Sequence, residues 1–319
     1  MKTKKSLMNR AVYITEAGKK IGFGHLKRAV SLQQLFPNYE FDIFLERTLS
    51  MDWKHEYKTW EVSLSLVVLI SQYDVVIFDS FHGNEQVYND LERHPCVIYI
   101  DDYVRYPVKN GLVVDWTVGA ERRKATGKSC CFGVDYLITR QPFFKPKETN
   151  CSNQITKIST IFGGSDPCDI SSKIASLIGN ERNLKVKHLG TKFYPSYPKF
   201  KDDKHFYWDL IDDDFAEHIL DSDIVITAGG QTLYEIASLG VPVIAISVAA
   251  NQDEDIEGFH RLGSCKVLGI ESISSILSLL KSITIEDRMG MIQASKCVDG
   301  RGDSLKLAID EFINECNGI

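Results

Sequence analysis

The sequence predicts an α/β protein made of two tandem Rossmann-like domains with a cleft between them. Short β-rich runs alternate with longer helical patterns along the 319-residue chain, and this alternation is typical of parallel sheets covered by helices on both faces. A polar stretch with two prolines, residues 141–154, interrupts the alternation near the middle. The length also suits two domains of roughly 150 residues. We therefore expect an N-terminal domain over residues 1–145 and a C-terminal domain over residues 155–319.

The N-terminal half carries the first set of expected elements. Its β-rich patterns predict strands over residues 10–15, 39–46, 73–80, 96–102 and 112–116. A helical pattern over residues 24–36 follows the first strand. Two of the buried strands end in carboxylates, Asp79 in one and Asp101 with Asp102 in the other. Loops and helix N-termini converge at the carboxyl ends of parallel strands, so we expect the chemistry at that edge of the sheet.

The C-terminal half repeats the alternation without repeating the sequence. Its β-rich patterns predict strands over residues 157–162, 183–190, 204–209, 222–228 and 241–247. We expect a helix over residues 232–240, and the amphipathic pattern over residues 302–316 predicts a last helix. This last helix could pack back on the N-terminal domain.

Composition excludes several classes of function. A net charge of −6 argues against a general nucleic-acid surface. No apolar run reaches the length of a membrane span, and no long apolar region follows the basic residues 1–10, so we expect neither a span nor a signal peptide. The eight cysteines show no CxxC, zinc-like spacing or disulfide framework. We expect reduced thiols, a cytoplasmic location, and no metal or cofactor.

Two glycine-rich turns follow strands of the second half. They are IFGGSDP at residues 161–167 and TAGGQT at residues 227–232. Glycine lets backbone N–H groups approach an anion, and the following helix N-terminus adds partial positive charge. Two such turns indicate a diphosphate site, while the absence of GK[ST] and GxGxxG argues against a P-loop or a dinucleotide fold. The candidate nucleotide-binding residues are Gly163, Gly164, Ser165, Gly229, Gly230, Gln231 and Thr232.

The two turns also have a simpler interpretation, because glycine is common in ordinary βα turns. Pro167 is placed to open a helix after the first turn, and Glu235 lies in the first turns of the helix after the second. Glu235 could accept both ribose hydroxyls of a nucleotide, or it could be an exposed helix carboxylate. Asn251 and Gln252 follow a strand and could bind sugar hydroxyls or phosphate; the alternative is a polar loop.

The segment IGFGHLKRA, residues 21–29, supplies the candidate catalytic residue. His25 follows the glycines Gly22 and Gly24 at the start of the predicted helix. An imidazole titrates near neutrality and can take a proton from water, and a helix N-terminus disfavours its positively charged form. Arg28, one turn on, could orient a phosphate or pair with a carboxylate. A helix cap or a packing role is the alternative for His25.

Residues after the strand at 73–80 are further candidate substrate contacts. Asp79, Phe81 and His82 come at or just beyond the end of this strand. Asp101 and Asp102 end the next strand and could assist His25 or cap a helix. The histidines at positions 188, 205 and 218 show no companion pattern, so we expect them to be structural or exposed.

Five motifs occur here in one order along nearly the whole chain: IGFGHLKRA, FGVDYLITRQPFF, FGGSDP, TAGGQTLYEIASLGVPVIAISVAANQ and VDGRGD. This order resembles the UDP-sugar hydrolases of the pseudaminic acid pathway, which act on UDP-2,4-diacetamido-2,4,6-trideoxy-β-L-altropyranose. That group is related to the GT-B glycosyltransferases, including the one that makes lipid II. The resemblance implies a GT-B architecture, UDP bound mainly by the second domain, a sugar projecting toward the first, and no metal.

The resemblance also implies roles for individual residues. His25 would activate a water that attacks the anomeric carbon with inversion and releases UDP. The turn 229–232 would cradle the diphosphate, Glu235 would hold the ribose, and Asn251 with Gln252 would face the sugar or phosphates. In the segment LIDDDFAEHI, Ile211 would contact uracil through its backbone. Tyr136 and Arg140 match a Y..R element that we interpret as structure near the hinge.

Departures from the family pattern leave other functions open. The family pattern RxDAS has Ile14 and Glu16 at the corresponding positions here, and its DHY is replaced by Asp79, Ser80 and Phe81. A phenolic hydroxyl that could bind sugar or water is therefore missing. The substrate could differ, or the reaction could be transfer to an acceptor by a GT-B glycosyltransferase of surface polysaccharide biosynthesis. A non-catalytic protein that binds a UDP-sugar is the third alternative.

Overall fold

The computed structural model describes residues 9–18, 23–46, 57–100, 105–124, 129–144, 151–208 and 215–318. Four residues singled out in the sequence, Gly22, Asp101, Asp102 and Ile211, lie outside these ranges. The predicted junction at residues 141–154 falls between two separate sheets, one in each half of the chain.

The first sheet contains seven described strands, all parallel, in the order β3-β2-β1-β4-β5-β6-β7. Their bounds are β1 (Asn9–Thr15), β2 (Tyr39–Glu46), β3 (Lys58–Trp60), β4 (Val75–Asp79), β5 (Val97–Ile100), β6 (Leu112–Asp115) and β7 (Ser129–Phe132). The five predicted strands of this half are confirmed, whereas β3 and β7 were not predicted. The direction of winding reverses between β1 and β4, and ligands of such sheets bind at this switch point.

The second sheet contains six described strands, also parallel, in the order β10-β9-β8-β11-β12-β13. They are β8 (Lys157–Ile161), β9 (Lys185–Gly190), β10 (Phe206–Trp208), β11 (Ile224–Ala228), β12 (Val243–Ile246) and β13 (Cys265–Leu268). All five strands predicted for this half are confirmed, and β13 is additional. Its switch point lies between β8 and β11.

Helices cover the sheets. In the first half they are α1 (Gly24–Gln33), α2 (Val67–Ile70) and α3 (Glu85–Leu91). Residues 170–316 form α4 (Ile170–Ile178), α5 (Tyr197–Phe200), α6 (Phe215–Leu220), α7 (Gln231–Ser238), α8 (Asp253–Leu262), α9 (Ile276–Ser282), α10 (Ile285–Ala294) and α11 (Asp303–Cys316). Short 3₁₀ turns are η1 (Ala120–Arg122), η2 (Val134–Tyr136), η3 (Gln141–Phe143), η4 (Ala250–Gln252), η5 (Ile270–Ser275) and η6 (Ser295–Cys297). Among the described helices, none is long and apolar enough to cross a membrane.

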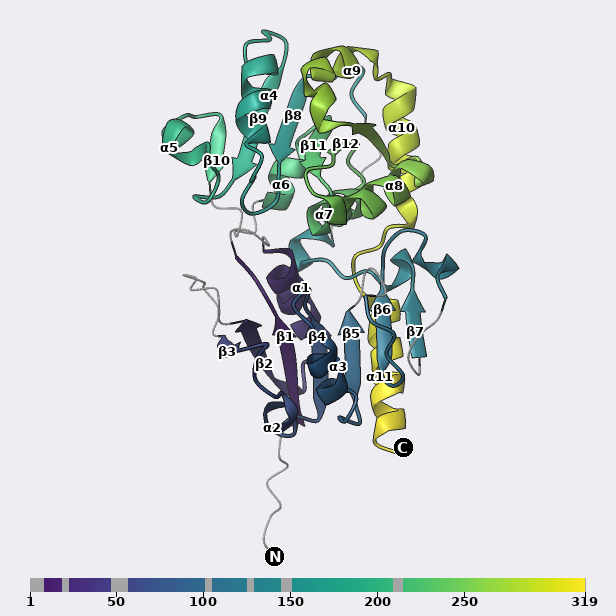
Figure 1. Cartoon of the computed structure of the whole chain (residues 1–319). Helices are drawn as coiled ribbons and strands as arrows, with labels where there is room; N and C mark the ends of the chain where they lie inside the picture. Colours follow the sequence, from purple (N-terminus) through teal and green to yellow (C-terminus); the bar gives the residue numbers. More distant parts are fainter. Residues whose placement is uncertain are drawn as a thin grey trace, which may run out of the picture.

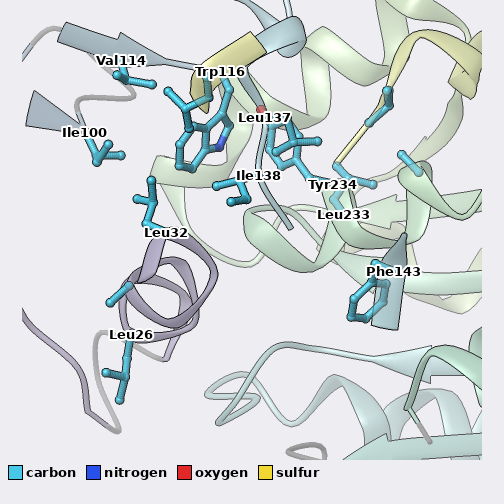
Figure 2. Close-up of a cluster of buried hydrophobic side chains, with 14 of the residues drawn as sticks. Leu26, Leu32, Ile100, Val114, Trp116, Leu137, Ile138, Phe143, Leu233 and Tyr234 are labelled. Atoms are coloured by element: carbon cyan, nitrogen blue, oxygen red, sulfur yellow. The ribbon is translucent and has the colours of Figure 1, made fainter. Parts of the chain in front are cut away.

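Hydrophobic clusters bury both faces of the first sheet. Along β1, Ala11 and Tyr13 belong to one cluster, whereas Val12 and Ile14 belong to another, because successive side chains of a strand point to opposite faces. Burial on both faces explains the near-continuous apolar strands. The first cluster extends from the N-terminal half into α7, as Figure 2 shows for Leu26, Leu32, Val114, Trp116, Leu137, Leu233 and Tyr234. One core therefore joins the two halves.

The chain crosses between the halves at two neighbouring places. The outgoing segment contains Ile138, which forms an isolated antiparallel bridge with Arg301 of the returning segment. The backbone N–H of Thr139 also donates to the Gly300 carbonyl at 2.8 Å. After the return, α11 lies beside β6 and β7 of the first sheet (Figure 1). Its apolar face, which includes Leu305 and Ile309, joins the core of the first half.

A substitution at Gly258 tests the contact between α8 and the N-terminal half. A Cβ atom at Gly258 of α8 would lie 2.7 Å from the Val118 carbonyl oxygen, so Gly258→Ala must displace backbone. We expect this overpacking to cost about 1–3 kcal/mol, outweighing the gain of roughly 1 kcal/mol that alanine brings to a helix. Gly290→Ala in α10 is the matched control, because no atom lies within 4 Å of its added Cβ.

Urea unfolding of the two variants measures the effect. The free energy of unfolding should fall for Gly258→Ala and rise for Gly290→Ala. An equal rise for both variants would contradict the direct packing of α8 on the Val118 backbone.

Candidate functional site

A cavity of about 480 Å³ lies between the two halves of the chain. In Figure 1, α1 and α7 lie between the two sheets at this level. The cavity walls come mainly from the segments after β1, β4, β8 and β11, the strands that flank the two switch points, together with residues after β12. The lining residues are Phe23, Gly24, His25, Lys27, Arg28, Phe81, Phe162, Gly163, Gly164, Ser165, Pro167, Gly229, Gly230, Gln231, Thr232, Val248, Ala249, Asn251, Gln252 and Asp255. Most residues predicted to bind substrate or nucleotide thus meet in one place.

His25 is the second residue of α1 and is held by a buried carboxylate. Its Nδ1 lies 2.8 Å from Oδ1 of Asp79, the last residue of β4. The two residues are 54 positions apart in the chain, but β4 pairs directly with β1, whose following segment leads into α1. The switch point of the first sheet therefore places the imidazole and the carboxylate together.

Asp79 is completely buried and accepts from several donors. The Tyr13 hydroxyl donates to Oδ2 at 2.6 Å, and Arg28 donates through Nε to Oδ2 at 3.0 Å and through Nη2 to Oδ1 at 2.7 Å. Burial alone would raise the pKa of Asp79, but the charge of Arg28, followed by the interactions of His25, holds that pKa well below its usual range. Asp79 is therefore an ionised, hydrogen-bonded carboxylate in the interior.

This network assigns the tautomer of His25. Nη2 of Arg28 also lies 2.7 Å from Nδ1, yet a guanidinium and a ring N–H both donate, and the carboxylate oxygen between them only accepts. The consistent arrangement has Nδ1–H and Arg28 each donating to Asp79. Nε2 then carries the lone pair, and no residue in the described ranges forms a hydrogen bond with it. A base oriented by a third group at a cavity wall is the pattern of general base catalysis.

Two residues predicted as substrate contacts, Asp79 and His82, do not line the cavity. Asp79 does not line the cavity, because its oxygens are committed to Tyr13, His25 and Arg28. It is a positioning residue for His25, the role considered for Asp101 and Asp102. His82 also lies outside the cavity lining, with its Nδ1 3.4 Å from a Glu46 carboxylate oxygen.

Phe81 does reach the cavity. Its ring meets the His25 ring edge-on, with centroids 4.9 Å apart and an interplanar angle of 89°. The guanidinium of Arg105 lies 4.2 Å from the centre of the same ring. Phe81 therefore forms an apolar wall next to the imidazole, at the position where the family pattern has a tyrosine.

The two glycine turns of the second half differ in whether a side chain caps the N-terminus of the helix that follows. Gly230, with φ of 80°, directly precedes α7, and no side chain of the described residues caps this helix. Its first N–H groups therefore remain without a capping side chain beside the cavity. In contrast, α4 begins at Ile170 and not at Pro167, and Asp166 accepts from the N–H groups of Ile170 and Ser171, both at 2.9 Å. The expectation that Pro167 opens a helix is wrong, and the Asp166 carboxylate already occupies the N-terminus of α4.

The first glycine turn instead packs against the N-terminal half. A Cβ at Gly164 would clash with the ring of Phe23, which precedes α1. The Tyr194 hydroxyl holds this turn by donating to the Gly163 carbonyl at 2.8 Å and accepting from the Phe162 N–H at 2.9 Å. Gly163, Gly164 and Ser165 thus line the cavity as a rigid loop.

Glu235 is not available to a ribose in this structure. Its carboxylate is buried and both oxygens accept from Arg140, Oε1 from Nε at 2.6 Å and Oε2 from Nη2 at 2.9 Å. The Arg140 guanidinium lies over the rings of Phe143 and Phe215. A buried charge needs a partner, and the planar guanidinium matches both carboxylate oxygens. Here Glu235 pairs the second half with the outgoing crossover segment, and its contact with a ribose stays a prediction.

Lys27 is a lining residue that sequence reasoning missed. A lysine two positions after His25 on an amphipathic helix is ordinarily solvated, yet Lys27 is only 9% exposed. The available signal was its spacing of three from Gly24, which places both residues on one face of α1.

In the ranges that the structure covers, no group of three His, Cys, Asp or Glu side chains is arranged to hold a metal ion.

The ionised state of Asp79 can be tested by measuring stability as a function of pH. Asp79→Asn leaves Arg28 buried without its carboxylate, so we expect a loss of about 3–5 kcal/mol at neutral pH. The folded pKa of Asp79 lies below the unfolded value of about 3.9. Its contribution is therefore complete above that unfolded value and disappears as the pH falls toward the folded one. We expect the difference in free energy of unfolding between wild type and variant, measured with urea from pH 7 to pH 3, to become smaller toward pH 3.

The exposed Asp202 supplies the control, because Asp202→Asn should change stability by less than about 0.5 kcal/mol at any of these pH values. A gap between wild type and Asp79→Asn that stays constant down to pH 3 would contradict the ionised state of Asp79.

Comparison with known proteins gives distant relatives. No protein-family model matches the chain. The uncharacterised protein MJ1062 of Methanocaldococcus jannaschii is 29% identical over 272 residues, 73% of this chain and 54% of that protein. A Helicobacter pylori protein named pseudaminic acid cytidylyltransferase and UDP-2,4-diacetamido-2,4,6-trideoxy-beta-L-altropyranose hydrolase is 24% identical over 248 residues, 75% of this chain and 45% of that protein. The spore coat polysaccharide biosynthesis protein SpsG of Bacillus subtilis is 26% identical over 146 residues, 43% of each chain.

The chain spans about half the length of the curated relatives it matches. Among solved structures, Acinetobacter baumannii MurG aligns with a TM-score of 0.65 at 13% identity, over 95% of this chain and 99% of that one. The S. aureus MnaA–UDP co-structure gives a TM-score of 0.61 at 14% identity, over 98% and 97%. At these identities the likeness concerns the fold. The predicted architecture, two parallel-sheet α/β domains of the GT-B type, is confirmed.

Proposed function

We propose that the protein hydrolyses a UDP-linked sugar, with His25 as the base that activates water. The observation that carries this proposal is the common cavity: the His25–Asp79 pair and the uncapped N-terminus of α7 line or adjoin the same space. One wall offers a proton acceptor and the facing wall offers backbone N–H groups suited to a diphosphate. The volume of about 480 Å³ falls within the range of about 300–1,000 Å³ typical of small-molecule sites.

The proposed reaction follows from these positions. The diphosphate lies against Gly229, Gly230 and the first turn of α7, where Gln231 and Thr232 line the cavity. The sugar then extends toward His25. A water oxygen attacks the anomeric carbon, its proton passes to Nε2 of His25, and the bond from that carbon to the diphosphate oxygen breaks. The electron pair leaves with UDP, and attack from the opposite side inverts the anomeric configuration.

Asp79 supports this step without touching the substrate. Its negative charge stabilises the imidazolium that forms when Nε2 accepts the proton, and its bond to Nδ1 fixes the ring orientation. Arg28 keeps Asp79 ionised. A diphosphate is a good leaving group when its charge is stabilised, so the main tasks of the protein are placement and electrostatic stabilisation.

The names of the relatives support a narrower substrate class. The Helicobacter pylori relative is named for hydrolysis of a UDP-linked diacetamido trideoxy sugar, and the Bacillus subtilis relative for spore coat polysaccharide biosynthesis. We assign to this chain a UDP-linked deoxy diacetamido sugar of pseudaminic or related nonulosonic acid biosynthesis. The rings of Phe23 and Phe81 give the cavity apolar surface that suits the methyl and acetamido groups of such a sugar.

Transfer of the sugar to an acceptor hydroxyl is the second candidate. Solved structures named as glycosyltransferases share this fold, and Phe81 replaces the hydroxyl-bearing residue of the hydrolase pattern. The same donor site would serve both reactions. The two differ in whether UDP is released from the donor when water is the sole acceptor.

The test is incubation of the pure protein with UDP-linked diacetamido deoxy sugars, followed by quantification of UDP and free sugar. We expect release of both without an added acceptor. His25→Asn retains a donor toward Asp79 but removes the free ring nitrogen, so turnover should fall at least about 100-fold while UDP affinity is retained. His82→Asn is the matched control outside the cavity, and its turnover should equal that of the wild type.

Other outcomes would contradict the assigned base or favour another function. Full turnover by His25→Asn would refute the assignment of the base. UDP release that requires an acceptor would favour a glycosyltransferase, and calorimetric binding without turnover under any condition would favour a UDP-sugar-binding protein.

A further inference from the structure

Lys27 faces α7 from the N-terminal half. Lys27 follows Gly24 by three residues, so both lie on the same face of α1. That face is directed at α7, since a Cβ at Gly24 would contact Cβ of Gln231 at 4.0 Å. Lys27, Gln231 and Thr232 all line the cavity. The lysine side chain and the start of α7 therefore belong to one part of the cavity wall.

Lys27 is a buried residue whose ammonium has no counter-ion among the described residues. In the portion of the chain that the structure describes, no hydrogen bond or ion pair holds Nζ, although the residue is only 9% exposed. Burial, followed by the positive charge of Arg140, lowers the pKa of Lys27 to about 8, and Glu235 acts in the opposite direction with a smaller effect. Both oxygens of Glu235 are already bound to Arg140.

The other charges of the cavity leave this cation uncompensated. Arg28 also lines the cavity, but its guanidinium is paired with Asp79. Asp255 lines the cavity, and its carboxylate accepts from the Tyr234 hydroxyl at 2.6 Å. The uncapped end of α7 adds further positive potential. An isolated buried cation next to a helix N-terminus is costly unless an anion binds there.

We propose that Lys27 binds the diphosphate of the substrate, opposite the N-terminus of α7. This assignment rests on the proposed function and adds a residue from the N-terminal half to a diphosphate site otherwise made by the C-terminal half. The ammonium donates charge-assisted hydrogen bonds to phosphate oxygens and neutralises part of the charge that UDP carries as it leaves. The substrate thus contacts both halves through its diphosphate as well as through its sugar.

The experiment compares wild type, Lys27→Met and Lys27→Arg by calorimetric titration with UDP, and uses inorganic pyrophosphate and uridine as competitors. Methionine keeps the length of the side chain and removes the charge. We expect Lys27→Met to bind UDP and pyrophosphate roughly 10- to 100-fold more weakly, the loss of one hydrogen-bonded charge, with uridine unchanged. Lys27→Arg should recover most of the affinity. Lys306→Met is the control and should match the wild type, because Lys306 is partly exposed, pairs with Asp310 and does not line the cavity.

Thermal unfolding separates this role from a structural one. Without ligand, Lys27→Met should be at least as stable as the wild type, because an uncompensated buried charge has been removed; with UDP, it should gain less stability. Unchanged UDP affinity in Lys27→Met, or an equal loss for uridine, overturns the assignment. A wild type that fails to bind UDP refutes the proposed function itself, which the wild-type titration reveals separately.

Discussion

The buried carboxylate of Asp79 is the interaction on which the geometry of the N-terminal half depends. It joins β4 to β1 through Tyr13 and to α1 through His25 and Arg28. An isolated carboxylate at this depth would be unstable, whereas one that accepts from three side chains stabilises the place where the strands and the helix meet. The position of the His25 ring at the cavity wall is a consequence of this arrangement, because its Nδ1 is one of the donors.

The C-terminal half shows how two similar turns acquire different uses. Both glycine turns follow strands at the switch point, and both line the cavity. Asp166 fills the N-terminus of α4, so that helix is satisfied internally. The start of α7 has no such side chain. Electrostatic potential for an anion is therefore concentrated at one turn, while the other provides shape and contact with Phe23.

The sequence was sufficient to predict the fold and most of the candidate residues that line the cavity. The alternating strands, the two halves, His25 and the turn at 229–232 depend on patterns within a few residues, and these patterns are visible without coordinates. The strands β3, β7 and β13 have only three or four residues, and each includes a polar or charged side chain, so they give no periodic signal. The roles of Asp79 and Glu235 could not be assigned, because each is decided by an arginine far away in the chain.

The path of α11 has a consequence for the order in which the molecule can assemble. The core of the first half includes Leu305, Ile309 and Phe312, which follow the entire second half in the chain. The N-terminal sheet cannot complete its apolar packing as an early, independent unit. Contacts between segments so distant in sequence close late and slow folding. We therefore expect the two halves to fold as one cooperative unit, even though each has its own sheet.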